Sequence, residues 1–283
     1  MILVTGAGGK TGAAVIRALA ARGAQARAFV RSDRHAAALR TQGAHDVHVG
    51  TLDDRAALTR AAAGTTAIYH ICPNVSPHEV DFARNIAAAG VKRVVYHSVL
   101  HPQIEAMPHH WQKMRAEELF LEAGLELTIL QPTAYMQNIL AGWPEIAGAG
   151  IYRVPYPAAT RLSLVDLDDV AEAAARVLTE PAHAGATYEL AGTLPLSQFE
   201  VADTLAAALD REVRVEAEPV EHWAKRATAA DLGDYARDTL IAMFRHYARH
   251  GLVGNPRVLT GLLGRPPATL TEFAAEAIRA PRP

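Results

Sequence analysis

The chain has 283 residues, of which half are hydrophobic and a fifth are charged. This composition supplies enough apolar side chains for a substantial core and is not that of a disordered protein. The formal net charge of −2 gives no electrostatic reason to expect binding to nucleic acid or to a membrane surface.

Cysteine content and hydropathy indicate the cellular compartment in which the protein is expected. The single cysteine, Cys72, excludes an internal disulfide and a cysteine-rich metal site, which fits a reducing environment. No charged and then apolar leader precedes the first predicted strand, and no apolar run reaches the length of a membrane span. We therefore expect a soluble, cytoplasmic protein.

Strand-like and helix-like segments alternate through the first part of the chain. The predicted strands lie at residues 2–5, 25–31, 46–49, 67–71, 91–98 and 126–131, and the first, fifth and sixth contain continuously apolar stretches. The predicted helices between them cover residues 11–22, 34–42, 55–63, 80–89 and 108–123. This order predicts an α/β fold, a doubly wound parallel Rossmann sheet with helices on both faces.

The alternation loosens after about residue 133. Asp166, Asp168 and Asp169 precede a predicted helix at 170–178, and residues 187–190 indicate a strand. A capping-box sequence from Ser197 to Glu200 predicts the start of a helix that runs to residue 209. Polar and apolar residues alternate at 211–216, which predicts a short strand, and residues 221–280 are predicted to be helical with interruptions. We expect a Rossmann domain at 1–132. We expect residues 133–283 to form a smaller, mainly helical substrate lobe mixed with the last Rossmann elements at about 160–192.

The first predicted strand runs directly into a glycine-rich turn that opens a helix. Glycines at 6, 9 and 12 permit a tight turn, a close approach of backbone to a pyrophosphate, and packing of the helix on the strand. An ordinary glycine turn is the alternative, but the strand before and the amphipathic helix after favour the binding loop. We predict that this loop binds a dinucleotide through Gly6, Gly8, Gly9, Lys10, Thr11 and Gly12.

The end of the second predicted strand indicates which dinucleotide binds. Arg31 stands where an acid would accept hydrogen bonds from the ribose 2′-hydroxyl of NAD, and a guanidinium suits the 2′-phosphate of NADP(H) instead. Lys10 and Arg34 could reach the same phosphate. Asp33 lies slightly farther along the chain than the acid that usually binds the ribose of NAD, so NAD stays an alternative cofactor. We predict NADP(H) as the cofactor.

Two further positions follow strands at the same edge of the predicted sheet. Asp53 could reach the adenine amine, although Asp53 or Asp54 would serve equally well as a helix cap. Cys72 follows the fourth strand, where backbone lines the cofactor. No basic residue is adjacent to it, so we interpret it as a small packing residue and not a nucleophile.

The richest polar cluster follows the fifth predicted strand. Ser98 lies at the carboxyl end of that strand, where ligands of parallel sheets bind. His109 and Lys113 are four residues apart and so share one face of the next helix. Lys113 could hold the nicotinamide ribose and His109 could donate a proton near neutral pH. The alternative is that His109 is an ordinary polar residue of a first helical turn and that Lys113 is a solvated surface lysine.

A metal site is a further interpretation of this region, because His97, His101, His109 and His110 crowd together in the sequence. Catalytic zinc needs three ligands at a fixed spacing, as in a His-Glu-x-x-His helix or a thiolate cluster. The sequence contains neither pattern. We therefore predict no metal.

These motifs together resemble the NmrA-like group of atypical short-chain dehydrogenases/reductases, nearly from end to end. The resemblance rests on the glycine loop, on Arg31, and on six further motifs: Tyr96-His97-Ser98-Val99, Pro108-His109-His110-x-x-Lys113, Leu130-Gln131-Pro132, Met136-Gln137-Asn138, Leu262-Leu263-Gly264-Arg265-Pro266-Pro267 and Thr271-Glu272-Phe273. The glycine motif is common to many reductases, whereas the His-His-x-x-Lys helix and the Gly-Arg-x-Pro ending are more specific.

The resemblance implies a Rossmann domain that binds NADP(H) and a small lobe that completes a substrate cleft. Some members reduce quinones, dyes or similar conjugated acceptors with NADPH, and others bind dinucleotide without turnover as redox-sensing regulators. The wider superfamily uses Tyr-x-x-x-Lys, and the matching residues are His109 and Lys113. Lys113 therefore carries over as a cofactor contact, and either His109 replaces the tyrosine or no residue does.

The resulting hypothesis is an NADPH-dependent oxidoreductase that transfers hydride to a small, quinone-like or conjugated acceptor. Gln131, Tyr135 and Asn138, at or after the sixth strand, are the candidates for the substrate cleft. The rival hypothesis is a non-catalytic NADP(H) sensor that acts through a protein partner, and a homo-oligomer also stays open. An epimerase is weaker, because that chemistry uses the tyrosine that this chain lacks.

Overall fold

The computed structural model describes residues 1–73 and 75–279, and the chain divides into two compact units. Unit 1 is made of three segments, Met1–Glu105, His109–Gln131 and Val170–Tyr188. Unit 2 contains Ala106–Pro108, Pro132–Asp169 and the described chain from Glu189 onward. The chain thus leaves unit 1 near Pro132 and returns to it at Val170 before leaving it again.

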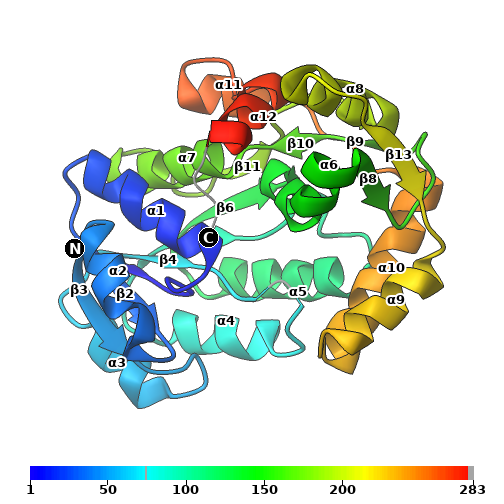
Figure 1. The fold of residues 1–283 in the computed structure, drawn as a ribbon. Coiled ribbons are helices and arrows are strands. Elements are labelled where there is room, and N and C mark those ends of the chain that lie inside the picture. Colours follow the sequence, from blue (N-terminus) through cyan, green and yellow to red (C-terminus); the bar gives the residue numbers. More distant parts are fainter. Residues whose placement is uncertain (74, 280–283) are drawn as a thin grey trace. The chain divides into compact units, whose positions relative to one another are not determined.

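A seven-stranded sheet with the order β11-β6-β5-β4-β1-β2-β3 organises unit 1 (Figure 1). Every pairing from β3 across to β6 is parallel. The strands cover Ile2–Val4 (β1), Ala26–Val30 (β2), Ala44–Val49 (β3), Ala67–His70 (β4), Arg93–His97 (β5), Glu126–Pro132 (β6) and Thr187–Leu190 (β11). The parallel Rossmann sheet expected from the sequence is therefore confirmed.

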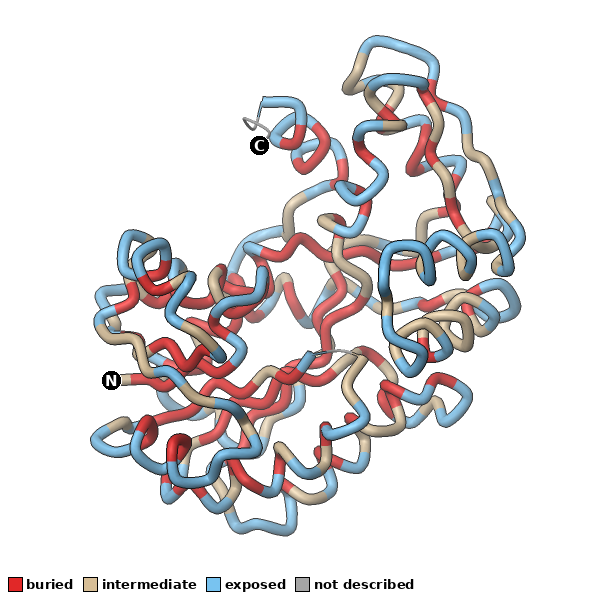
Figure 2. The backbone as a smooth tube through the Cα atoms, turned by 60° about the horizontal axis from the view of Figure 1, so that its bottom comes forward, coloured by how far each residue is buried: buried red, intermediate tan, exposed pale blue. Residues whose placement is uncertain are grey.

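Helices cover both faces of this sheet, with α1 and α7 on one side and α3, α4 and α5 on the other (Figure 1). Burial on both faces explains why the inner strands β1 and β4 are buried along their whole length, whereas the edge strand β3 is polar and only partly buried. The buried stretches of these strands form the red interior of Figure 2. The helices are Lys10–Ala21 (α1), Ala36–Thr41 (α2, after the 3₁₀ turn η1 at Asp33–His35), Arg55–Ala62 (α3), Glu79–Ala87 (α4), Pro108–Glu122 (α5) and Leu167–Thr179 (α7).

One predicted helix start needs correction. Asp166, Asp168 and Asp169 were all expected before the helix, yet α7 begins at Leu167 and takes the last two into its first turn. The carboxylate of Asp166 accepts a hydrogen bond from the backbone N–H of Asp168 at 2.7 Å. Asp166 therefore caps the helix, and the negative charges that follow are favourable near its positive end.

Unit 2 holds the other helices and three two-stranded pairings. The pairings are β10-β7, β12-β9 and β13-β8. The elements are Ala134–Tyr135 (β7), Met136–Gly142 (η2), Trp143–Ala149 (α6), Ile151–Val154 (β8), Arg161–Leu162 (β9), Leu164–Val165 (β10), Leu196–Ser197 (β12), Gln198–Leu209 (α8), Arg214–Ala217 (β13), Val220–Ala229 (α9), Asp234–His250 (α10), Arg257–Leu263 (α11) and Leu270–Arg279 (α12).

Local sequence signals explain part of unit 2. The predicted capping box is present: Ser197 accepts a hydrogen bond from the N–H of Glu200, and Glu200 accepts one from the N–H of Ser197. Helix α6 was not predicted, because the prolines around it indicated irregular chain. Pro144 lies at its first positions, where a missing N–H is tolerated.

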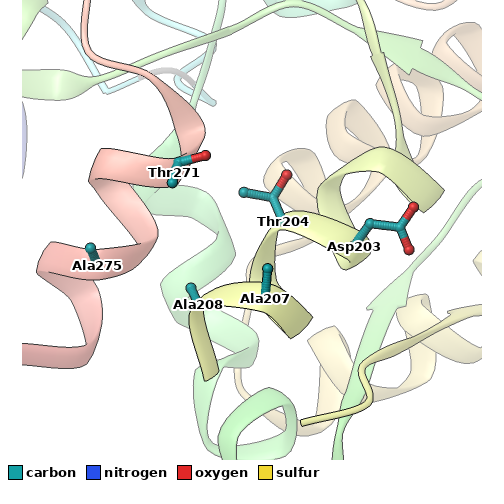
Figure 3. A pocket seen from close by; sticks show the side chains of 6 residues that line it. All are labelled: Asp203, Thr204, Ala207, Ala208, Thr271 and Ala275. Atoms are coloured by element: carbon teal, nitrogen blue, oxygen red, sulfur yellow. The ribbon is translucent and has the colours of Figure 1, made fainter. Parts of the chain in front are cut away.

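An open groove runs between α8 and α12 (Figure 3). Its walls are small or short side chains, which let the two helices approach closely, namely Asp203, Thr204, Ala207, Ala208, Thr271 and Ala275. No helix in the described part of the chain is long and apolar enough to cross a membrane.

Candidate functional site

The glycine loop between β1 and α1 adopts a conformation that requires glycine at two positions. Gly6 has φ of +59°, and a Cβ there would lie 2.8 Å from Cγ2 of Ile71. A Cβ on Gly12 would lie 2.5 Å from the carbonyl oxygen of Gly6 and 2.7 Å from Cα of Ala7. The loop therefore folds tightly onto the start of its own helix, as a phosphate-binding turn must.

The start of α1 is open for an anion. Gly9 is its N-cap residue and provides no side-chain cap, so the first-turn amides lack a side-chain acceptor of the kind that caps α3 and α8. Gly8, Gly9 and Lys10 are exposed, whereas Thr11 is buried. Free N–H groups and the positive end of the helix dipole suit a pyrophosphate. This geometry fits the dinucleotide that the sequence predicts.

The proposed 2′-phosphate contacts lie next to this loop. Arg31 is exposed and directly follows β2. Arg34 lies in η1 and its Nε donates to Nε2 of His35 at 2.8 Å. The ring of His35 lies 3.4 Å from the position that a Cβ on Gly8 would take, so η1 borders the glycine loop. Arg34, one of the cations predicted to select NADP(H), therefore lies in a turn that borders the glycine loop.

The choice between Asp53 and Asp54 as a helix cap is settled in favour of Asp54. Its carboxylate accepts a hydrogen bond from the N–H of Ala57 at 2.9 Å, which caps α3. Asp53 is exposed, and a hydrogen bond from Thr51 lowers the pKa of its carboxyl. An ionised, exposed Asp53 suits an adenine amine, and the cofactor contact stays a prediction.

Lys113 is buried in unit 1 with only 2% of its side chain exposed. Its Nζ donates to Oε1 of Glu79 at 3.3 Å and to the carbonyl oxygen of His97 at 3.1 Å. The ammonium also lies 5.3 Å from the centre of the Tyr96 ring. A buried ammonium needs such compensation, because leaving water costs several kcal/mol. Lys113 is therefore held firmly by α4 and β5, and the alternative that it is a solvated surface lysine is excluded.

Glu79 begins α4 and joins three other elements. Its carboxylate accepts a hydrogen bond from the Tyr96 hydroxyl at 2.7 Å and one from the Cys72 thiol. Burial by itself would raise the pKa of Glu79, but Lys113, the neighbouring His70 and these two hydrogen bonds outweigh burial and lower it. Glu79 is thus an ionised carboxylate inside unit 1. The sequence analysis missed it, since nothing but its place after the fourth strand marks it.

Cys72 and His70 accompany this network without being reactive. Burial raises the pKa of the Cys72 thiol far above its usual value, so it is no thiolate nucleophile. Burial lowers the pKa of His70 to about 4, which leaves a neutral ring that hydrogen-bonds to the Thr5 hydroxyl at 3.0 Å. Thr5 in turn accepts from the N–H of Ile71. These contacts tie the carboxyl ends of β1 and β4 beside the glycine loop.

His109, the predicted proton donor, is also buried, with 2% exposed. Burial, followed by the charges of His110 and Lys113, lowers its pKa to about 3. Its Nδ1 has no hydrogen-bond partner among the described residues. At neutral pH the side chain is a neutral imidazole and not the imidazolium acid that the unperturbed pKa suggested. Any proton that it donates must come from the neutral ring.

A second buried carboxylate, Glu117, follows Lys113 by one helical turn on α5. The Ser98 hydroxyl donates to it, and Nε2 of Gln131 donates to both of its oxygens at 2.9 and 3.1 Å. Burial raises the pKa of Glu117 despite these bonds. Ser98 and Gln131 were predicted to contact cofactor and substrate, and in this structure their side chains contact Glu117. The four-residue spacing of His109, Lys113 and Glu117 is the signal that could have found it.

The other predicted substrate residues belong to unit 2. Tyr135 is half-buried at the end of β7, and Asn138 is exposed on η2. Their neighbour Gln137 fastens this turn, donating to Asp166 at 2.9 Å and accepting from the N–H of Leu167. In residues 1–73 and 75–279, no three His, Cys, Asp or Glu side chains gather as a metal site.

A parallel sheet with a glycine loop at the end of β1 and an uncapped helix after it defines a dinucleotide-binding Rossmann protein. The comparison with protein families makes this specific, because the model of the NmrA-like family matches residues 1–273. The chain belongs to the NmrA-like family.

Known relatives match over nearly the full length. Quinone oxidoreductase 2 of Escherichia coli (strain K12) is 29% identical over 278 residues, 96% of this chain and 96% of that protein. NAD(P)H azoreductase of Xenophilus azovorans is 29% identical over 280 residues, 97% and 96% of the two chains. A crystal structure of an NADPH-dependent quinone oxidoreductase from Escherichia coli complexed with NADPH superposes with a TM-score of 0.86 at 28% identity, covering 98% of this chain and all of that one.

Proposed function

We propose that the protein is an NADPH-dependent oxidoreductase that reduces a quinone-like or otherwise conjugated small molecule. The observation that carries the proposal is the glycine loop, where Gly6 and Gly12 leave no room for a Cβ and α1 presents an uncapped end. Relatives named for quinone and azo reduction, matched over at least 96% of this chain, support the acceptor class.

The chain's own residues divide into two groups of cofactor contacts. The loop backbone seats the pyrophosphate, and Arg31 and Lys10 contact the 2′-phosphate, because cations at this position complement its charge. Bound NADPH would supply the hydride. The further contacts that we propose lie at the carboxyl ends of the strands, at Asp53, Cys72, Ser98 and Lys113.

The acceptor end needs no strong acid. Negative charge that arrives on a quinone or conjugated acceptor delocalises over the π-system, so water or a weak donor can complete protonation. His109 is the donor that we propose, acting from its neutral form since its pKa is about 3. Tyr135 and Asn138 would hold the substrate oxygen, because the amide nitrogen of Gln131 already donates to Glu117. Lys113 orients the ribose through a charged hydrogen bond.

The test is NADPH oxidation by the purified protein with a panel of quinones, dyes and conjugated enones. We expect turnover, and we expect Arg31→Ala to weaken NADPH binding far more than NADH binding. Arg40→Ala is the matched control, because Arg40 is an exposed arginine of the neighbouring helix α2. Equal losses for both dinucleotides in Arg31→Ala would remove the 2′-phosphate assignment.

A second function is favoured by one specific observation. The position of the superfamily's tyrosine holds His109, which is neutral and buried. A protein that binds NADP(H) without turnover would need no acid there, and it would report the cofactor state to a protein partner. Tight NADPH binding without oxidation across the whole panel would favour this sensor over the reductase.

A further inference from the structure

Glu79 and Lys113 form a buried ion pair in unit 1. Each side chain is 2% exposed, and the pair comes from the first residue of α4 and the second turn of α5. Surface ion pairs contribute little to stability, but breaking a buried one strands a charge and is strongly unfavourable. The carboxylate therefore determines where the ammonium can lie.

The described residues supply acceptors for two of the three N–H groups of Lys113. Glu79 takes one and the carbonyl oxygen of His97 takes another, while the Tyr96 ring lies beside the ammonium. One donor is thus left over after the protein has fixed the direction of the other two. An ammonium held in this way can offer that donor to a ligand in one orientation.

Glu79 is itself held by groups that fix its direction. The Tyr96 hydroxyl donates to the same oxygen, Oε1, that faces Lys113, and the Cys72 thiol donates to the carboxylate as well. The carboxylate also lies in the first turn of α4, where the helix dipole stabilises negative charge. Three elements, β5, the segment after β4 and α4, therefore determine its position.

We propose that Glu79 is the positioning residue of the cofactor site, acting through Lys113 and oriented by the Tyr96 hydroxyl. Its carboxylate holds the ammonium so that the remaining N–H faces the nicotinamide ribose. This inference rests on the proposed function, in that it requires Lys113 to contact NADP(H). It adds a carboxylate that touches neither cofactor nor substrate and yet sets the affinity for the cofactor.

The experiment is a double-mutant cycle on NADP⁺ binding, measured by isothermal titration calorimetry. Glu79→Gln keeps the shape and an acceptor for Tyr96 but removes the charge, and we expect it to weaken binding by about tenfold, as for residues coupled in one network. Lys113→Gln should weaken binding as well. The double variant should be no weaker than Lys113→Gln alone, because Glu79 acts through the lysine.

Two further variants separate positioning from simple structural support. Glu79→Asp keeps the charge and should recover part of the affinity, whereas Tyr96→Phe, which leaves no charge unpaired, should weaken binding in the same direction by less. Glu118→Gln is the control, since Glu118 is an exposed carboxylate of α5 that pairs with Arg115. Thermal unfolding of each variant identifies any loss of fold, and Tyr96→Phe keeps the test decisive if Glu79→Gln does not fold.

The outcomes separate this inference from the proposed function. Additive losses in the cycle, or wild-type affinity in Glu79→Gln, would overturn the inference while leaving the reductase in place. Coupled losses in a protein that binds NADP⁺ but oxidises no acceptor would support the inference and contradict the reductase. A wild-type protein that does not bind NADP⁺ would overturn both.

Discussion

Replacing Gly12 by alanine tests whether the glycine loop is built as the structure indicates. Two effects of opposite sign compete. Alanine is a better helix former than glycine by about 1 kcal/mol, and Gly12 lies in the first turn of α1. The new Cβ, however, would lie 2.5 Å from the Gly6 carbonyl oxygen, whereas ordinary contacts begin at 3.4 Å. Backbone must therefore move by about 0.9 Å, the difference between those two distances.

The clash should win, because its partners are backbone atoms that no rotamer change can move away. Overpacking costs about 1–3 kcal/mol, and rigid backbone partners place this site at the upper end. After the gain in helix propensity we expect a net loss of about 2 kcal/mol, which corresponds to a fall in Tm of about 4–8 °C for a chain of this size. The displaced loop should also lose most of its affinity for NADPH.

The assay is differential scanning calorimetry together with a fluorescence titration of NADPH. Gly261→Ala is the matched control, because Gly261 lies in helix α11 with nothing within 4 Å of its would-be Cβ. The same chemical change there should leave Tm unchanged or slightly higher. Wild-type Tm and wild-type NADPH affinity in Gly12→Ala would refute the close approach of α1 to the loop and the pyrophosphate assignment with it.

Four further predictions address separate features. Ser197→Ala removes the hydroxyl that caps α8 and that also donates to Glu200, whereas the backbone N–H at position 197 keeps its bond to Glu200; the change should lower the free energy of unfolding by about 1 kcal/mol in urea titrations. The carboxylate of Asp169 accepts hydrogen bonds from Arg265 at 2.7 Å and from the N–H of Ala268. Asp169→Asn should weaken both bonds and lower the free energy of unfolding by about 1.5–3 kcal/mol, again in urea titrations. The free energy of unfolding should fall as pH drops from 6.5, the ordinary histidine pKa, to about 4, because the unfolded chain takes up protons at His70, His97 and His109 before the folded chain does. His70→Asn should remove one of these three contributions and make the slope shallower, and an unchanged slope would contradict a buried neutral His70 ring. His109→Ala should lower turnover by about 10²-fold or more if the ring donates the proton. Because the pKa of His109 is about 3, the pH profile of wild-type kcat should show no inflection near pH 6.5 that is due to His109. Unchanged turnover of the variant at every pH would rule out the donor role.

The sequence was sufficient to predict unit 1 because its signals are local and agree with one another. Continuous apolar runs gave the strands of a sheet buried on both faces, and the glycine loop at 6–12 gave the first βα turn. Most strand and helix ends differ by one or two residues, as for Ala44–Val49 against the expected 46–49, whereas α7 begins at Leu167 and not at the expected 170. The weaker prediction lay in unit 2, where two-residue strands such as Arg161–Leu162 are too short to show a period.

Only part of the candidate site could be predicted, because the sequence does not show which side chains are buried. Motifs identify residue types but not burial, and burial lowers the pKa of His109 so far that its imidazolium form is not populated near neutral pH. Glu79 and Glu117 were missed because a carboxylate in a helix is normally solvated, and only tertiary packing reveals that these two face buried partners. Ser98 was expected to face a ligand, and in the structure its hydroxyl donates to Glu117.

The order of the strands has a consequence for biosynthesis. The outermost strand of the sheet, β11 at Thr187–Leu190, pairs with β6, yet about fifty residues that belong mainly to unit 2 separate the two in the chain. While the ribosome makes those residues, β6 presents an unpaired, apolar edge, which is the feature most prone to join another chain. Completion of the nucleotide-binding sheet thus waits for two-thirds of the polypeptide to be translated. A nascent chain halted before Thr187 should aggregate or recruit chaperones, and one that extends past Leu190 should not.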